Sequence, residues 1–367
     1  MVVSLRTPSA DCRIKALKSY ITETFTNVDV FYVNLGDLRT VRINSFYPGT
    51  SGIIGRQFKL SLTAPVDNPD AVIWLWRETG CNDFISRVLR IKEDYDPRMG
   101  DWHEVFHYND KKEMLPMASI DPAGKWGIHI SYNNEYFFGL DGLGPETWFK
   151  EGHFFVQALF RILNLRSSSL VHGACVGQDG AGVLLCSRGG GGKSTLTVKA
   201  LLKGFEYVSD DYLILDSSAG NLNASPVYSF VALSPIMYEE MYDNLNKAHF
   251  LGVSPWKGKY VFDISGYEDH FRRHYPVKAL LFPEIDVDSP RPSIIKCSAA
   301  EKGKAIVQIA HSTLSQMGFK GFSGNQKDSE FIRKTILMLN GLECFRIVLS
   351  KNLDANVDCL SNFLKQI

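Results

Sequence analysis

The sequence predicts an α/β C-terminal domain, residues 143–367, preceded by a β-rich N-terminal domain, residues 1–142. Three observations support this prediction. Alternating β-branched and aromatic residues recur through the N-terminal part. A Gly/Pro-rich break, Asp141-Gly-Leu-Gly-Pro145, separates that part from the rest. Beyond the break, an apolar strand, a run of glycines and an amphipathic helix follow one another at 182–204.

Composition and charge are those of an ordinary globular chain. The 367 residues are 45% hydrophobic and 22% charged, and 40 basic residues balance 40 acidic ones. This balance argues against nucleic acid or a membrane surface as the partner. No signal peptide or membrane span is expected, because no apolar run is long enough. The seven cysteines are scattered without a C-x-x-C pair, which favours the reduced cytoplasm.

The N-terminal domain is expected to begin with a helix and to continue as strands. Apolar spacing predicts the helix at 13–24, and patterns of period two predict the strands. The predicted strands span 28–33, 40–44, 57–63 and 71–76, with a hairpin of 125–132 and 135–139. Segments rich in Gly, Pro and Asp, at 49–55 and 64–70, are predicted to be turns.

One motif in this domain is typical of zinc hydrolases. His103-Glu-Val-Phe-His107 matches H-E-x-x-H, in which a helix turns both imidazoles to one metal and Glu104 serves as general base. Asp101 and Glu104 resemble a capping box, so a helix is expected here. A catalytic zinc needs a third protein ligand, and no His follows at short spacing. We therefore expect a surface or substrate-facing helix rather than a zinc site.

The stretch at 182–195 carries the functional prediction. Val183-Leu-Leu-Cys186 is a buried-strand pattern, and the following glycines let backbone N–H groups approach phosphate oxygens. The helix that begins after them adds N–H donors and partial positive charge. Ser187 stands where the G-x-x-x-x-G-K-[ST] pattern has its first glycine. The residues expected to bind phosphates are Gly189, Gly190, Gly191, Gly192, Lys193, Ser194 and Thr195.

Two carboxylates follow one helix later. Asp210 and Asp211 lie between two apolar segments of 205–215. A carboxylate there can hold Mg²⁺, and a second can accept the proton of an attacking hydroxyl. Ser-Asp-Asp is also good turn chemistry, so a solvated turn is the alternative. The preceding glycine loop favours the functional interpretation.

The run from Val171 to Thr195, with Lys203 to Asp211, resembles the catalytic core of the HPr kinase/phosphorylase family and its related serine kinases. Those cores show His-Gly or His-Ala, two strands, the phosphate loop, a helix and then Gly-x-x-x-x-Ser/Ala-Asp-Asp, all of which occur here in order. The resemblance covers about residues 165–367. It implies a P-loop kinase core of the HPr kinase/phosphoenolpyruvate carboxykinase type, with ATP and Mg²⁺ as cofactors.

The resemblance also implies roles for single residues. Lys193 and Ser194 would bind the triphosphate and Mg²⁺. Asp210 would be the base and Asp211 the metal ligand, or the reverse. His172 would lie near the phosphates, and a buried histidine that ties two strands together is the alternative. The arginine that the family uses is not aligned, and solvated basic loops are the alternative for its candidates, Arg272, Arg273, Lys257 and Lys259.

The remaining elements complete the α/β pattern. A helix is expected between 148 and 163, a hairpin at 212–228 and a helix at 236–245. An acceptor-binding lid is expected within 234–275 from position alone. The later predictions are a strand at 279–282, helices at 298–316 and 328–339, a strand at 345–349 and a final helix.

These patterns lead to hypotheses of different classes. The first is an ATP- and Mg²⁺-dependent serine/threonine kinase whose partner is a peptide or protein acceptor, with a small-molecule hydroxyl kinase as a variant. The second is a nucleotide-binding regulatory module with little turnover, and the third is the zinc hydrolase. The sequence names neither the acceptor nor the choice between ATP and GTP, and it is compatible with a homo-oligomer.

Overall fold

The computed structural model describes residues 10–77, 104–108, 114–115, 127–132, 134–140, 155–163, 167–187, 189–218, 220–254, 258–316 and 326–367. The chain divides into two compact units. The first comprises Met1–Val33, Thr40–Ile54 and Thr63–Trp148, and the second comprises Asn34–Arg39, Gly55–Leu62 and Phe149–Ile367. The second unit thus includes two short segments from the N-terminal part of the sequence.

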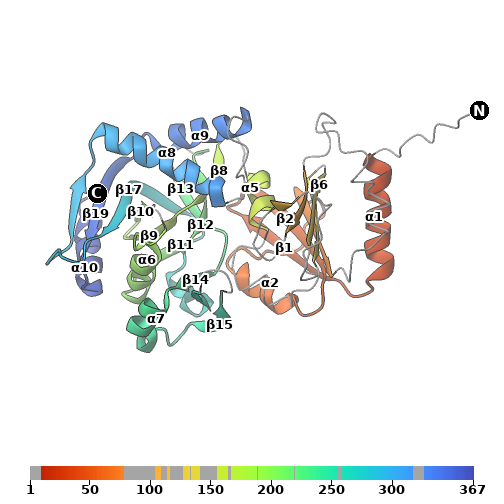
Figure 1. The fold of residues 1–367 in the computed structure, drawn as a ribbon, viewed down its shortest axis with the longest axis horizontal. Helices are drawn as coiled ribbons and strands as arrows, with labels where there is room; N and C mark the ends of the chain where they lie inside the picture. Colours follow the sequence, from red (N-terminus) through yellow and green to blue (C-terminus); the bar gives the residue numbers. More distant parts are fainter. Residues whose placement is uncertain are drawn as a thin grey trace, which may run out of the picture. The chain divides into compact units, whose positions relative to one another are not determined.

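Within the described residues, the first unit is built on a seven-stranded mixed sheet (Figure 1). Its order is β1 (Asp29–Leu35), β2 (Arg39–Phe46), β3 (Ala71–Arg77), β7 (Glu135–Leu140), β6 (Gly127–Tyr132), β4 (Glu104–Tyr108) and β5 (Met114–Leu115). The helix α1 (Ala10–Thr24) buries Ile14, Leu17 and Ile21. The predicted helix at 13–24, the strands β1, β2 and β3 and the β6–β7 hairpin are confirmed.

The predicted strand at 57–63 is wrong. The helix α2 (Ser51–Gln57) occupies most of the segment that was predicted to be a turn, and a turn follows it. The helix starts where the Thr50 carbonyl accepts hydrogen bonds from the amides of Ile53 and Ile54. Phe58 is fully buried, and its ring lies 5.3 Å from that of Tyr228. Its burial comes from a tertiary contact, which a local alternating pattern cannot distinguish from strand pairing.

The predicted helix over the H-E-x-x-H motif is also wrong. Glu104–Tyr108 is strand β4, which pairs antiparallel with β6. Residues four apart in a strand are separated by roughly 13 Å, so the strand lacks the spacing that lets a helix bring two imidazoles to one metal. His103 lies outside the described residues. Pairing with β6 therefore outweighs the local helix signal of the capping box.

In the described part of the second unit, a nine-stranded sheet carries helices on both faces (Figure 1). Its strands are β8 (Ser168–His172), β9 (Ala174–Gln178), β10 (Ala181–Leu185), β11 (Glu206–Ser209), β12 (Tyr212–Asp216), β13 (Asn223–Pro226), β17 (Tyr275–Ile285), β18 (Ser293–Lys296) and β19 (Glu343–Leu349). The helices are α5 (Val156–Leu163), α6 (Lys193–Leu202), α8 (Ala299–Gln316), α9 (Gln326–Leu339) and α10 (Leu353–Leu364).

Strand β10 shows how the core is layered. Val183 and Leu185 pack in one apolar cluster with residues of α6 and α10. Leu184 and Cys186 point the other way, into a cluster that includes residues of α8 and α9. A strand covered on both faces needs a continuous apolar run, which is what 183–186 supplies. The chain is therefore a mixed α/β structure in this unit.

Three neighbouring strands run parallel through the centre of this sheet. Leu185 of β10 pairs with Leu281 of β17, and Ile285 of β17 pairs with Leu349 of β19. Their carboxyl ends therefore meet at one edge, where α6 also begins. In open α/β sheets, ligands bind in the crevice outside the carboxyl ends of the strands.

The helix predicted between 148 and 163 is present as α5 over 156–163, and residues 148–154 lie outside the described ranges. The other elements predicted for this unit are present in its described part. Strands β12 and β13 form the predicted hairpin. The helix α7 (Pro235–Met241) is followed by the short helix η1 (Tyr242–Asn244), and α8 begins at the predicted capping box, where Ser298 donates to Glu301 and Glu301 donates back to it. No helix in the described ranges is both long and apolar enough to cross a membrane.

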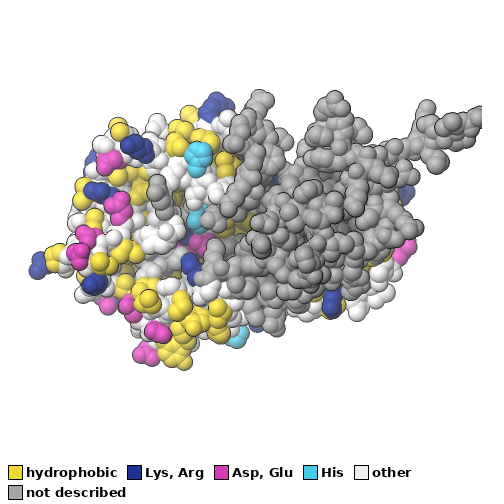
Figure 2. Space-filling model, in the orientation of Figure 1, with side chains coloured by type: hydrophobic (Ala, Val, Ile, Leu, Met, Phe, Trp, Pro, Cys, Tyr) yellow, Lys and Arg dark blue, Asp and Glu magenta, His cyan; other side chains and the backbone are white. Residues whose placement is uncertain are grey.

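A smaller sheet holds the segment in which an acceptor-binding lid was predicted. Its described strands are β14 (Phe230–Leu233), β16 (Tyr260–Asp263) and β15 (His249–Val253), followed by the short helix η2 (Ser265–His270). Figure 2 shows hydrophobic side chains gathered on the surface over α7 and β15, where Ile236, Tyr242 and Phe250 are 66%, 61% and 49% exposed. The lid itself stays a prediction.

Candidate functional site

The loop between β10 and α6 depends on glycine at two kinds of position. Gly190 and Gly192 have φ angles of 85° and 88°, which side-chain-bearing residues rarely adopt. A Cβ at Gly192 would lie 2.6 Å from Leu349, and one at Gly191 would lie 2.7 Å from Ser187. The inner side of the loop is thus packed against the sheet edge. Arg188 lies outside the described residues.

The outer side of the same loop is open. Among the described residues, no atom lies within 4 Å of where a Cβ on Gly189 or Gly190 would stand. Lys193 is the first residue of α6 and is buried, whereas Ser194 and Thr195 are half-buried in its first turn. Open glycine backbone in front of a helix N-terminus is the arrangement that binds anions elsewhere.

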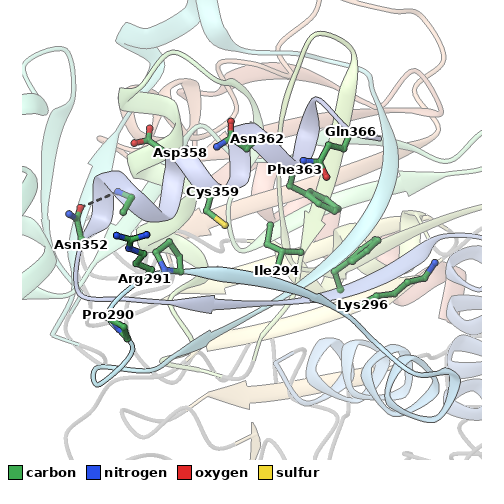
Figure 3. A pocket seen from close by; sticks show the side chains of 13 residues that line it. Pro290, Arg291, Ile294, Lys296, Asn352, Asp358, Cys359, Asn362, Phe363 and Gln366 are labelled. Atoms are coloured by element: carbon green, nitrogen blue, oxygen red, sulfur yellow. Dashed lines mark hydrogen bonds between the residues drawn. The ribbon is translucent and has the colours of Figure 1, made fainter.

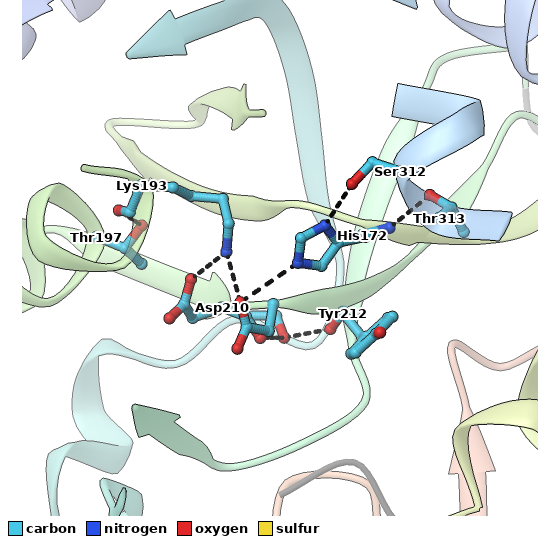
Figure 4. Close-up of polar contacts among 9 residues, drawn as sticks. His172, Lys193, Thr197, Asp210, Tyr212, Ser312 and Thr313 are labelled. Carbon is cyan, nitrogen blue, oxygen red and sulfur yellow. Dashed lines mark hydrogen bonds and ion pairs between the residues drawn. The ribbon is translucent and has the colours of Figure 1, made fainter. Parts of the chain in front are cut away.

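The Lys193 ammonium lies between two carboxyl groups (Figure 4). Its Nζ is 2.8 Å from Asp210 Oδ1 and 2.9 Å from Asp211 Oδ1. The three side chains are 7%, 1% and 13% exposed. Burial alone would lower the pKa of Lys193, but the charges and hydrogen bonds of the two aspartates outweigh burial and raise it. The lysine therefore stays charged in this site.

The two aspartates occupy a strained turn between β11 and β12. Asp211 has a φ of 65°, and the Tyr212 amide donates to the Asp210 carbonyl at 2.9 Å. A hydrogen bond from one residue to the carbonyl two positions earlier, with a positive φ at the residue between, defines a rare and strained form of the γ-turn. The Gly173 amide holds the Asp211 carbonyl at 3.0 Å. This turn carries the two carboxylates to one lysine.

The cluster has unused hydrogen-bonding capacity. Asp210 Oδ2 is buried and has no hydrogen-bond partner among the described residues. Two carboxyl groups also share the one Lys193 ammonium. A buried polar atom without a partner is costly in a folded protein, and such atoms concentrate where a ligand or an ion completes the site.

His172 joins the cluster from strand β8. Its Nε2 lies 3.6 Å from Asp211 Oδ1, and its Nδ1 lies 3.1 Å from the Ser312 hydroxyl on α8 (Figure 4). Its backbone amide donates to the Thr313 hydroxyl at 2.9 Å. The histidine therefore anchors β8 to α8 and also faces the aspartates, so both interpretations of this residue find a contact in the structure.

Sequence analysis missed Ser312 and Thr313. They are about 140 residues away from His172 along the chain, and only the packing of α8 on the sheet brings them there. No local signal marks them, because a serine or threonine inside a helix often bonds its own backbone, as Thr313 does to the Ile309 carbonyl.

Among the candidate basic residues, Arg272 belongs to a different cluster. Its Nε donates to Glu206 Oε1 at 2.7 Å. Glu206 starts β11, so it lies roughly 13 Å along the strand from Asp210. Arg273 is exposed, Lys259 immediately precedes β16, and Lys257 lies outside the described residues.

Comparisons with known proteins add little to this geometry. No protein-family model and no curated protein matches the chain. Among solved structures, the chain is similar to the Hpr(Ser) kinase/phosphatase from Coxiella burnetii, at 12% sequence identity and a TM-score of 0.31. The match covers 54% of this chain and 97% of that one. A likeness of this size carries no weight for function, so membership of the HPr kinase family stays a prediction from the sequence motifs.

Proposed function

We propose that this protein is a phosphotransferase that uses ATP and Mg²⁺ to phosphorylate a hydroxyl, with a serine or threonine side chain of a peptide or protein as its acceptor. One observation carries the proposal. Lys193, at the N-terminus of α6 and behind an open glycine loop, is held within 3 Å of two buried aspartates. The acceptor class comes from the sequence resemblance.

Donor phosphates would bind on the loop and the first turn of α6. Backbone N–H groups of 189–192 and the helix N-terminus supply donors and partial positive charge. Lys193 adds a full charge, and its raised pKa keeps that charge at neutral pH. When a triphosphate arrives, the ammonium would exchange part of its contact with the aspartates for the phosphate oxygens. Phosphoryl transfer depends mainly on positioning and on charge, so these groups would supply most of the rate.

The residues present fit Mg²⁺. Asp211 and the Ser194 hydroxyl offer the hard oxygen donors that this ion prefers. Asp210 Oδ2, which has no hydrogen-bond partner in the described part of the chain, offers a further oxygen donor beside Lys193. In the described ranges, no three His, Cys, Asp or Glu side chains form a metal cage, and Mg²⁺ usually completes its shell with phosphates and water. When bound, Mg²⁺ would neutralise charge on the phosphates.

Asp210 would be the base that activates the acceptor hydroxyl. Its Oδ2 has no hydrogen-bond partner among the described residues, so it can accept one from a hydroxyl that enters the site. Asp211 would then hold the metal, with His172 at 3.6 Å restraining its carboxylate. The reverse division of duties between the two aspartates uses the same contacts, and single substitutions separate the two orders.

The test measures binding and transfer separately. Purified wild-type protein, Asp210→Asn and Ser194→Ala would be incubated with γ-labelled ATP, Mg²⁺ and a lysate of the source cells, and ATP affinity would be measured by calorimetry. We expect Asp210→Asn to lower labelling of a discrete acceptor by roughly 100-fold or more while ATP affinity changes little. Ser194→Ala should raise the Mg²⁺ concentration that half-maximal labelling requires.

Lys203→Ala is the matched control, because this lysine follows α6 and its side chain is 44% exposed. It should label acceptor at the wild-type rate. Labelling by Asp210→Asn at the wild-type rate would contradict the proposed role of that residue. A wild-type protein that binds ATP and labels no acceptor would instead support the regulatory module, and failure to bind any nucleotide would overturn the proposal.

A further inference from the structure

A groove of about 840 Å³ lies at the edge of the nine-stranded sheet, outside the lysine–aspartate cluster. Figure 3 shows side chains of α10 and of β18 facing each other across it. Its lining residues are Pro290, Arg291, Pro292, Ile294, Lys296, Phe345, Asn352, Ala355, Asp358, Cys359, Asn362, Phe363 and Gln366. The volume is in the range of sites for small ligands.

One end of the groove lies at the same sheet edge as the glycine loop. Leu349, the last residue of β19, is the side chain that a Cβ on Gly192 would meet at 2.6 Å. The Asp286 amide donates to the Leu349 carbonyl at 2.9 Å, so the 286–292 segment begins beside it. Ser293 pairs with Val348 across one strand spacing of roughly 5 Å. Arg291 and Asn352 therefore line the groove at the sheet edge where the loop and α6 begin.

The walls of the groove are firmly held at that end. Asn352 caps α10 by accepting a hydrogen bond from the Ala355 amide at 3.0 Å. Two more hydrogen bonds, of 2.9 Å each, tie Asn356 to the Ser350 backbone. At the floor, the rings of Phe345 and Phe363 meet edge to face at 4.8 Å. A site with these supports needs little reorganisation to receive a ligand.

The lining has the chemistry of a nucleobase site. Two amides at the carboxyl end of α10, those of Asn362 in its last turn and Gln366 just beyond it, offer paired donors and acceptors of the kind that read purine edges. The guanidinium of Arg291 and the aromatic floor offer planar groups on which a base can stack. A phosphate alone would use none of these groups except the cations.

We propose that this groove binds the purine nucleoside part of the triphosphate whose phosphates bind the glycine loop. The inference rests on the proposed function and adds to it the residues that select the nucleoside. The carboxyl ends of β10, β17 and β19 then serve one ligand, with the phosphates at β10 and the base beyond β19.

The experiment compares ATP with inorganic tripolyphosphate, which has the phosphates without the nucleoside. Both affinities would be measured by calorimetry in Mg²⁺ for the wild type, Ala355→Trp and Asn362→Ala. Ala355 is half-buried in the groove, so a tryptophan there fills the space. We expect Ala355→Trp to weaken ATP at least tenfold and Asn362→Ala to weaken it severalfold, with tripolyphosphate changed less than twofold in both.

Ala300→Trp is the matched control, an exposed alanine in the first turn of α8, and it should bind both ligands as the wild type does. An unchanged ATP affinity in Ala355→Trp would overturn the inference and leave the proposed function standing. Equal weakening of ATP and tripolyphosphate would also overturn it. A wild type that binds neither ligand would overturn both the inference and the proposed function.

Discussion

Strand β11 carries an ionic cluster at each end, and the two clusters differ in what they leave unused. At its start, Glu206 accepts hydrogen bonds from the Arg272 guanidinium, at 2.7 Å, and from the Tyr275 hydroxyl. Just past its end, Asp210 and Asp211 share one lysine at 2.8 and 2.9 Å. Asp210 there keeps a buried oxygen without a hydrogen-bond partner among the described residues.

Solvent and backbone conformation also separate the two clusters. The side chains of Arg272 and Glu206 are 39% and 22% exposed, whereas those of Lys193 and Asp210 are 7% and 1% exposed. The buried cluster also includes the positive φ of Asp211. Similar residue types thus make a solvated structural tie in one place and a strained, incompletely paired site in the other. Ligand sites often retain strained backbone and polar atoms without partners, although both lower the stability of the fold.

The largest expected difference between the clusters is in the cost of removing a cation. Lys193→Met removes the ammonium that two buried carboxyl groups share, so it should lower the free energy of unfolding by roughly 3–5 kcal/mol. Arg272→Met, which removes the partly exposed partner of Glu206, should cost about 1 kcal/mol or less. Urea unfolding of both variants measures the difference. Equal costs would show that the buried cluster depends on its cation no more than the solvated cluster does.

A smaller effect is expected at the edge of the buried cluster. The Ser312 hydroxyl, 3.1 Å from His172 Nδ1, should set which ring nitrogen carries the proton. Ser312→Ala should change the ¹⁵N chemical shifts of the His172 ring and lower phosphate transfer by roughly tenfold, with little change in unfolding free energy. Ser315→Ala, an exposed serine on the same helix, is the control. Unchanged ring shifts would show that Ser312 does not position the histidine.

The smallest effect is expected at the solvated cluster, and it depends on pH. Burial would raise the pKa of Glu206, but hydrogen bonds from Tyr275 and Arg272 outweigh it and hold the pKa below 4.5. A lowered pKa in the folded state adds stability above pH 4.5 that is lost as pH falls through the folded pKa. Glu206→Gln should therefore be less stable than wild type at pH 7, by less than about 1 kcal/mol.

The same urea titrations at pH 7 and at pH 3 check the sign of this effect. The difference between wild type and Glu206→Gln should shrink at the lower pH, and phosphate transfer at pH 7 should be unchanged. A difference that grows on acidification would show that the carboxylate is not stabilised in the fold. A loss of transfer would place this cluster in the site after all.

The elements of the second unit were largely predictable because their signals are local. The apolar run of β10, the glycines and the first turn of α6 lie within fourteen residues of one another. The capping box at Ser298 likewise predicts the start of α8 from residues that are close in the sequence. Predictions failed at 57–63 and 103–107, where tertiary packing of Phe58 and sheet pairing of β4 decided the local structure.

The sequence by itself determined the candidate chemistry of this protein: a glycine loop, a lysine and two carboxylates, chosen by residue type and order. Only the tertiary structure decided that these groups meet, since the Lys193–Asp210 contact needs β10 and β11 to flank β9 in one sheet. It alone placed Ser312 behind His172 and formed the groove along α10. The chemistry of each side chain follows from its residue type alone, whereas contacts between distant residues depend on how sheets and helices pack together.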